Sequence, residues 1–190
     1  MGNGRKGATL RQSDEESFRR FATGYAASLR RSAFLFCGDW HLAEDLMQTT
    51  LIKIYRSWSR VQKEDSLANY GRTVLLRTWL DEKRRPWRRS EFSEAEVPDR
   101  HDASADPADG TNAMWAKDLV HRGLLRLPPR QRAVLVLRYF DDLSVAETAE
   151  VMRCSQGTVK SQTARGLDAL RSSVARLSAE ELGPGRRVSL

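Results

Sequence analysis

Two stretches of the chain carry the three- and four-residue apolar spacing of amphipathic helices, and a stretch without that spacing separates them. In the first, Ser13 or Asp14 begins a helix, and Gly38 marks its end, because glycine commonly follows the last helical residue. Another helix ends before Pro86, which disfavours helical backbone in the residue before it. We therefore expect three helices here, over residues 13–37, 40–58 and 67–85.

The second stretch resumes the helical spacing at Trp115 and breaks it at Pro128 and Pro129. A helix restarts and runs to Phe140, and a two-aspartate turn follows it. A short helix to residue 152, a three-residue turn over 153–155 and a longer helix to about residue 174 complete the pattern. No part of the chain shows the alternation of a β-strand.

The intervening residues are rich in acidic and small side chains, with Pro98, Pro107 and Gly110 among them. Such a composition buries too little apolar surface to offset the entropy lost on ordering. The fold class is therefore all-α, with two small helical domains joined by a flexible acidic linker. The expected bounds are 13–89 for the first domain, 90–113 for the linker and 114–177 for the second domain.

The composition favours a polyanionic partner, because the net charge is +7 and the isoelectric point is near 9.8. No apolar run approaches the roughly 20 residues of a membrane span. Cys37 and Cys154 have neither metal-ligand spacing nor a disulfide framework around them, which fits the reducing cytoplasm. The three histidines are scattered, and no nucleophile or phosphate-loop motif occurs. We expect no enzyme activity, catalytic residue, metal or cofactor.

The pattern from Ser144 to Arg171 is typical of a helix-turn-helix. Ser144 with Glu147 predicts a capping box, and Ser155 can cap the second helix. The start of that second helix suits DNA, since its free amides favour phosphate and its short polar side chains permit close approach to the major groove. An ordinary helical hairpin with a solvated outer face is the alternative interpretation.

A basic cluster ends the third expected helix, with Trp79 and Trp87 beside it as flat surfaces on which an unpaired base could stack. A solvated basic helix end is the alternative, because cations complement the helix dipole there. The cluster comprises Lys83, Arg84, Arg85, Arg88 and Arg89, preceded by Arg72 and Arg77.

A third candidate surface lies on the second expected helix, opposite its apolar stripe. It is polar with a central isoleucine, a composition that suits the docking of a partner helix but is also common on solvated surfaces. Its residues are Asp45, Gln48, Thr49, Ile52 and Arg56.

Taken together, the residues resemble the extracytoplasmic-function (group IV) sigma factors, and more loosely their SigE-like actinobacterial branch. In the second half the resemblance runs through Leu127-Pro128, Arg132, Leu137-Arg138-Tyr139, Leu143-Ser144, Glu147, Ala149, Ser155, Gly157 to Ser161 and Arg165-Gly166-Leu167. In the first half it rests on Ala43 to Thr49, Tyr70, Arg72, Leu75 and Arg84-Arg85.

The resemblance implies an RNA polymerase sigma factor that recognises promoter minus-10 and minus-35 elements as part of the holoenzyme. Its partners would be core RNA polymerase and promoter DNA, and relatives commonly have an anti-sigma factor as well. Asp45, Gln48, Thr49 and Ile52 would bind the polymerase. Arg72, Arg77, Arg84, Arg85 and Arg88 would bind the minus-10 element, and Ser155, Thr158, Lys160, Ser161 and Arg165 the minus-35 duplex.

Two departures leave the promoter sequence open: Arg77 stands where many relatives have asparagine, and Gln162 where many have arginine. A single bidentate hydrogen-bonded pair between a side chain and a base is worth about 1 to 3 kcal/mol of discrimination, enough to change the preferred base. One rival interpretation is a stand-alone helix-turn-helix regulator with a dimerisation or sensor domain. A more distant one is a nucleic-acid-processing enzyme, which would need clustered acids or a metal site.

Overall fold

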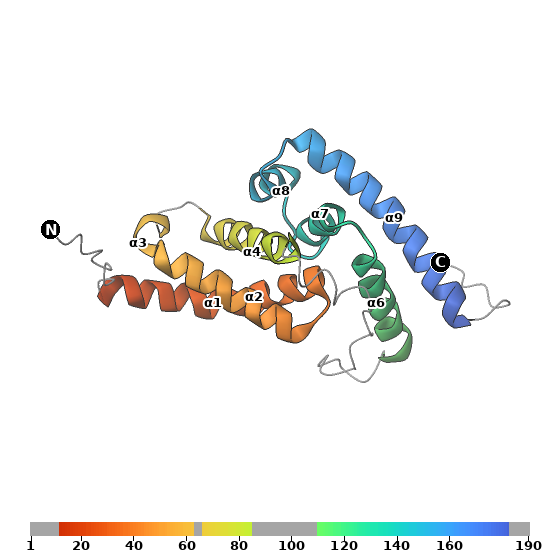
Figure 1. The fold of residues 1–190 in the computed structure, drawn as a ribbon, viewed down its shortest axis with the longest axis horizontal. Helices are drawn as coiled ribbons and strands as arrows, with labels where there is room; N and C mark the ends of the chain where they lie inside the picture. Colours follow the sequence, from red (N-terminus) through yellow and green to blue (C-terminus); the bar gives the residue numbers. More distant parts are fainter. Residues whose placement is uncertain (1–11, 63–65, 85–109, 183–190) are drawn as a thin grey trace.

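The computed structural model of the chain describes residues 12–62, 66–84 and 110–182. Within these ranges the regular structure is entirely helical (Figure 1). None of the helices there is long and apolar enough to cross a membrane. The helices are α1 (Gln12–Cys37), α2 (Trp40–Arg56), α3 (Trp58–Val61), α4 (Leu67–Arg84), α6 (Gly110–Leu125), α7 (Pro129–Tyr139), α8 (Val145–Met152) and α9 (Gln156–Leu182).

A two-residue turn connects α1 to α2 and folds them back on one another. Gly38 has a φ of 82°, a left-handed conformation that glycine adopts without steric cost. Asp39 then caps α2, because its carboxylate accepts a hydrogen bond of 2.6 Å from the Leu42 amide. The helix ends at Arg56 rather than at the expected Trp58, which instead begins the single turn of α3.

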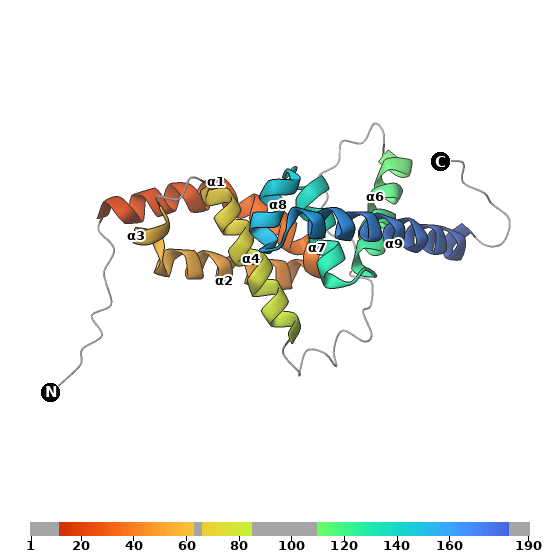
Figure 2. The same ribbon diagram turned by 90° about the horizontal axis from the view of Figure 1, so that it is seen from above.

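The buried stripe expected on the second helix is largely confirmed. Leu46, Thr50, Ile54 and Trp58 are buried, and Leu42 is half-buried. Helix α4 crosses α1 and α2 and closes this first helical unit (Figure 2).

In the second half, α9 packs along α6, α7 and α8. Helix α7 begins at Pro129, where proline loses no helical hydrogen bond because the first amides of a helix have no partner. Helix α6 begins at Gly110, ahead of the residue at which the second domain was expected to begin. The expected linker otherwise lies outside the described residues.

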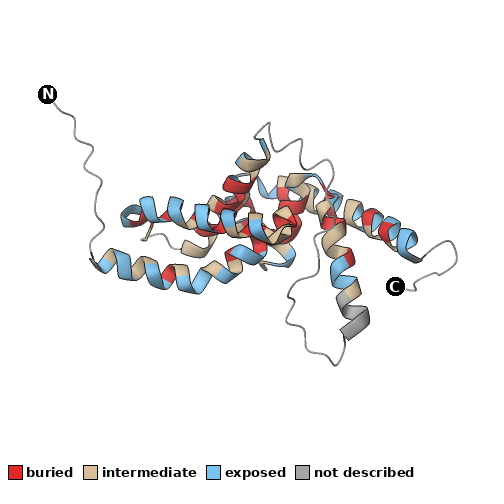
Figure 3. Ribbon diagram, turned by 60° about the horizontal axis from the view of Figure 1, so that its bottom comes forward, coloured by how far each residue is buried: buried red, intermediate tan, exposed pale blue. Residues whose placement is uncertain are grey.

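The two halves share a buried core. Phe36 and Trp79 of the first half join Leu137, Leu143 and Val151 of the second half in one apolar cluster. Buried residues concentrate where α1 and α4 meet α7 and α8 (Figure 3). Two domains therefore exist as expected, but they pack against each other rather than standing apart.

Candidate nucleic-acid interface

The helix-turn-helix is built by two side-chain caps and one residue with left-handed backbone. The Glu147 amide donates to the Ser144 hydroxyl at 3.1 Å, and the Ser144 amide donates to the Glu147 carboxylate at 2.8 Å. These hydrogen bonds with Ser144 lower the pKa of Glu147. Arg153 ends α8 in a left-handed conformation with a φ of 50°, which turns the chain into α9. The expected capping box and turn are confirmed.

The first turns of α9 present most of the predicted minus-35 residues to solvent, whereas Thr158 is half-buried. The Thr158 amide donates to the Ser155 hydroxyl at 3.1 Å, which confirms the expected cap. Lys160, Ser161 and Arg165 are exposed. Behind them Val159 is buried, so the amphipathic pattern turns their side chains outward. Anions are favoured at this helix end by the dipole and the free amides.

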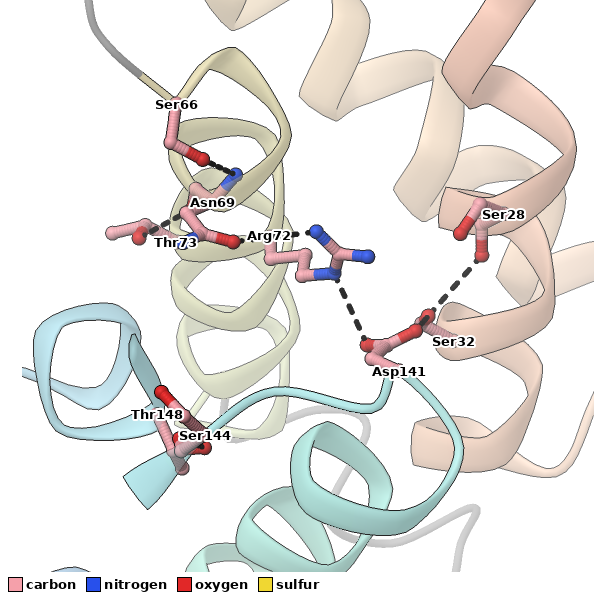
Figure 4. Close-up of polar contacts among 9 residues, drawn as sticks. All are labelled: Ser28, Ser32, Ser66, Asn69, Arg72, Thr73, Asp141, Ser144 and Thr148. Carbon is pink, nitrogen blue, oxygen red and sulfur yellow. Dashed lines mark hydrogen bonds and ion pairs between the residues drawn. The ribbon is translucent and has the colours of Figure 1, made fainter. Parts of the chain in front are cut away.

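Helix α4 divides the predicted minus-10 residues between two environments. Arg77 and Arg84 are exposed, and Arg84 lies 3.8 Å from Asp81 across an exposed ion pair. Arg72 instead has a side chain that is only 17% exposed. Its guanidinium lies between Asn69 of the same helix and Asp141 of the second half (Figure 4). Arg85 and Arg88 lie outside the described residues.

The expectation that Trp79 offers a surface for an unpaired base is wrong. The indole is 1% exposed and stacks on Phe36 with ring centroids 4.9 Å apart. Leu75, Leu76 and Trp79 follow helical spacing and form the buried stripe of α4, a signal that the sequence already contained. The other tryptophan considered for stacking, Trp87, lies outside the described residues.

The polar face of α2 is open to solvent at every position expected for polymerase binding. Asp45, Gln48, Thr49 and Ile52 are exposed, and the Ile52 side chain is an exposed large hydrophobic residue. Sequence reasoning missed Tyr55, which is 38% exposed and lies one turn beyond Ile52. Its place at helical spacing from Ile52 is the signal that could have identified it.

The α2 face is held at a fixed position relative to α4 by a polar contact between the two helices. The Lys53 ammonium donates to the Thr78 hydroxyl at 2.9 Å, and that hydroxyl donates to the Val74 carbonyl at 2.8 Å. Thr78 is buried and Lys53 is exposed, so the contact lies at the edge of the α2–α4 packing and joins the two helices there. No local sequence pattern indicates this pairing.

Cys37 and His121 are titratable residues whose pKa values are shifted because they pack inside the fold. Burial raises the pKa of the Cys37 thiol to about 11, and its sulfur donates to the Asp39 carbonyl at 3.2 Å. Burial lowers the pKa of His121, which stacks on Phe34 with ring centroids 4.4 Å apart. No group of three or more metal-ligating side chains occurs among residues 12–62, 66–84 and 110–182.

Comparison with known proteins places both halves of the chain. The family described as Sigma-70 region 2 matches residues 12–89, and the family described as Sigma-70, region 4 matches residues 117–170. The RNA polymerase sigma-E factor of Streptomyces avermitilis is 34% identical over 147 residues, which are 77% of this chain and 79% of that protein. The sigma-E factor of Streptomyces coelicolor is also 34% identical, over 77% of this chain and 80% of that protein.

Solved structures share the fold. The sigma factor RpoE of Bartonella quintana, in complex with the anti-sigma factor NepR, superposes with a TM-score of 0.69 at 22% identity, over 84% of this chain and 98% of that one. CnrH in complex with the cytosolic domain of CnrY gives a TM-score of 0.61 at 16% identity, over 85% of this chain and 90% of that one.

Proposed function

Since the chain belongs to the sigma-70 family of RNA polymerase sigma factors, in its extracytoplasmic-function group, we propose how its surfaces divide the work of promoter recognition. The protein acts with core RNA polymerase to recognise promoter DNA and start transcription. We assign residues 13–89 to core-polymerase and minus-10 binding and residues 114–177 to minus-35 binding, with 90–113 as the linker. The observation that carries this proposal is the capped helix-turn-helix with an exposed basic face, combined with a separate exposed face on α2.

The polymerase contact is assigned to α2. Asp45, Gln48 and Thr49 form a polar rim around Ile52, and an exposed apolar residue within such a rim is the usual composition of a docking surface. Lys53 and Thr78 hold this surface against α4, so polymerase binding and minus-10 binding share one rigid support.

The minus-10 contact is assigned to the basic residues of α4 and those after it. Arginines neutralise phosphates and stack on unpaired bases, which suits a melted strand. Arg77 and Arg84 are accessible, whereas Arg72 becomes accessible only if its ion pair opens. Arg85 and Arg88 complete the proposed set from the sequence alone.

The minus-35 contact is assigned to the start of α9. Its amides and dipole attract phosphate, and Lys160 and Arg165 add charge that makes binding salt-dependent. Ser155 caps the helix and thereby positions the contacts that follow it. The proposed residues are Ser155, Thr158, Lys160, Ser161 and Arg165.

We propose that the chain has no enzyme activity of its own and works in the cytoplasm, where RNA polymerase works. An anti-sigma factor is a fitting regulator, because a solved structure with this fold is a complex with the anti-sigma factor NepR. Such a partner would act by covering the α2 face or the DNA-binding surfaces.

The test is binding of the purified protein to core RNA polymerase, followed by transcription from a pool of promoters. We expect Asp45→Ala and Gln48→Ala to weaken core binding about fivefold to thirtyfold, because truncations at the centre of a docking surface cost about 1 to 2 kcal/mol. Glu16→Ala is the control, since it removes an exposed acid from α1, away from the α2 face.

A second control concerns DNA. Lys160→Ala should weaken binding to minus-35 duplex DNA, whereas Arg176→Ala, on the same helix about 24 Å further along, should not. No core binding together with tight duplex binding by the protein alone would overturn the proposal in favour of a stand-alone regulator. Family membership does not favour that alternative.

A further inference from the structure

Two buried N–H groups in the apolar core have no hydrogen-bond acceptor in the part of the chain that the structure describes. They are Nε of Arg132, on α7, and the indole Nε1 of Trp79, on α4, and these residues are only 4% and 1% exposed. Buried donors without an acceptor are rare in folded proteins, and an unseen water or ion is a common explanation for one. Because both groups are donors, whatever completes them must accept hydrogen bonds.

The two donors belong to side chains that lie close together. The guanidinium carbon of Arg132 is 5.7 Å from the centre of the Trp79 ring. That separation is similar to the roughly 6 Å that one atom spans when it accepts two hydrogen bonds of about 3 Å each. A single bound atom can therefore accept from both residues.

The surroundings of these donors are positively charged. The other two guanidinium nitrogens of Arg132 donate to backbone carbonyls, and no carboxylate of the described residues pairs with this side chain. The Lys83 ammonium lies 5.9 Å from the centre of the same Trp79 ring. Burial lowers the pKa of Arg132 to about 10, and burial and the charge of Arg132 both lower the pKa of Lys83. An anion beside them would relieve this cost.

Charge and packing select among the possible occupants. A water molecule would complete the two hydrogen bonds but would leave the buried guanidinium without a counter-ion. A small anion does both, since its hydrogen bonds with a cationic donor are strengthened by charge. Phe36, Leu75 and Leu76 pack in the same core cluster and are at most 3% exposed. Such close packing suits a monatomic ion better than a phosphate or sulfate with four oxygens.

We propose that a chloride ion binds between Arg132 and Trp79, with Lys83 beside it. The site joins α7 of the second half to α4 of the first. It goes beyond the proposed function, since neither the polymerase nor DNA takes part in it. The stability of the folded chain then depends on the concentration of chloride.

The test is urea unfolding of the full-length protein as sodium chloride replaces sodium gluconate at constant ionic strength. A ligand that binds only the folded chain raises the folding equilibrium constant by a factor of one plus its concentration divided by its dissociation constant. We therefore expect a rise of about tenfold when chloride reaches about ten times that constant, and a comparable rise with sodium bromide. Equal stabilities in chloride and gluconate would overturn the inference.

Two tryptophan variants separate the site from the general loss of an indole. Trp58 and Trp79 are both 1% exposed, but Trp58 Nε1 donates to the Ser17 hydroxyl at 2.7 Å, whereas Trp79 Nε1 has no acceptor. Trp79→Phe keeps a ring at this position and removes only the donor, so it should lose most of the chloride response. Trp58→Phe should retain that response. Equal chloride responses in the two variants would contradict a site at Trp79.

Anomalous scattering from bromide locates the ion without any variant. Crystals of the wild-type protein grown in sodium bromide should show an anomalous peak within hydrogen-bond reach of Arg132 Nε and Trp79 Nε1. A water molecule at that position, without anomalous signal, would overturn the inference. This measurement decides the question even if Trp79→Phe does not fold.

Discussion

The two helices assigned to DNA differ in what covers them. The start of α9 is open, and Lys160, Ser161 and Arg165 face solvent. Helix α4 is covered on one side by α7 and α8, so Arg72 and Trp79 are inaccessible there. A basic helix identified in a sequence therefore need not be accessible to DNA, because its exposure depends on which other elements pack against it.

The two helices differ in exposure because they pack against other elements on different numbers of sides. The start of α9 carries one apolar stripe, with Val159 facing its own half, and so leaves its opposite side polar. Helix α4 packs against α1 and α2 and also against α8. Changes at the contact between the halves should therefore expose α4 and leave the start of α9 as it is.

The largest effect is expected from Arg132→Met. This buried guanidinium donates to the carbonyls of Phe36, Leu125 and Leu127, and burial lowers its pKa to about 10, so it remains charged at neutral pH. Its loss leaves those carbonyls unpaired, at a cost of about 3 kcal/mol in the free energy of unfolding. Urea unfolding measures the cost, and hydrogen exchange should accelerate in α4 more than in the first turns of α9.

Arg130→Met is the matched control, because Arg130 is an exposed arginine of the same helix. It should change stability by no more than about 0.5 kcal/mol. Equal losses of stability in the two variants would show that the carbonyl contacts of Arg132 do not hold the halves together.

The elements of the fold that local chemistry controls were predictable. The capping box of Ser144 and Glu147 and the cap at Ser155 are interactions within three residues, so the residue types themselves indicate them. The end of α1 follows for the same reason, since Gly38 supplies the left-handed turn. The exposed faces of α2 and α9 followed from periodicity.

Contacts between the halves were not predictable. Arg132 lies 96 positions from the carbonyl of Phe36 that it binds, and no local pattern reveals such a pairing. Arg72 has the same sequence signature as Arg77, yet one is buried against Asp141 and the other is exposed. Which side of α4 the second half would cover depends on tertiary packing. The prediction for Trp79 was wrong for a different reason, because the helical spacing of Leu75, Leu76 and Trp79 already indicated a buried stripe.

A smaller effect is expected from Gly38→Ala. A Cβ atom there would lie 2.6 Å from the Leu125 side chain of α6, and the φ of 82° strains any side chain. We expect a loss of about 1 to 2 kcal/mol in the free energy of unfolding, measured by urea titration, because Leu125 can shift only part of the way. The packing of α1 against α6 should loosen, and the protection of α4 amides from hydrogen exchange should fall with it.

Gly24→Ala is the control within α1. Nothing lies within 4 Å of the Cβ it would add, so it should stabilise the helix by about 0.5 to 1 kcal/mol. Opposite signs for the two substitutions are the expected outcome. A loss of the same size at Gly24 would mean that α1, rather than its contact with α6, controls the effect.

The smallest effect is expected from pH, through His121 on the α6 side of the contact. Its Nε2 atom is buried without a hydrogen-bond partner, and burial lowers the pKa, although the Phe34 backbone and Asp118 oppose that shift while Arg132 adds to it. The unfolded chain therefore binds the proton more readily. The stability that neutral His121 contributes is present above about pH 6.5 and is lost as the pH falls through that value toward the lower folded pKa.

Asp141 works in the opposite direction, because its raised pKa makes the folded form the better proton acceptor and adds stability as the pH falls through that raised value. Urea titrations between pH 7.5 and 5.5 should show a falling free energy of unfolding in the wild type. The proton on His121 contributes at most about 1.4 kcal/mol per pH unit to that fall. His121→Gln should remove that decline, whereas His41→Gln, at an exposed position of α2, should retain it. If both variants keep the wild-type slope, protonation of His121 does not destabilise the contact between α6 and α1.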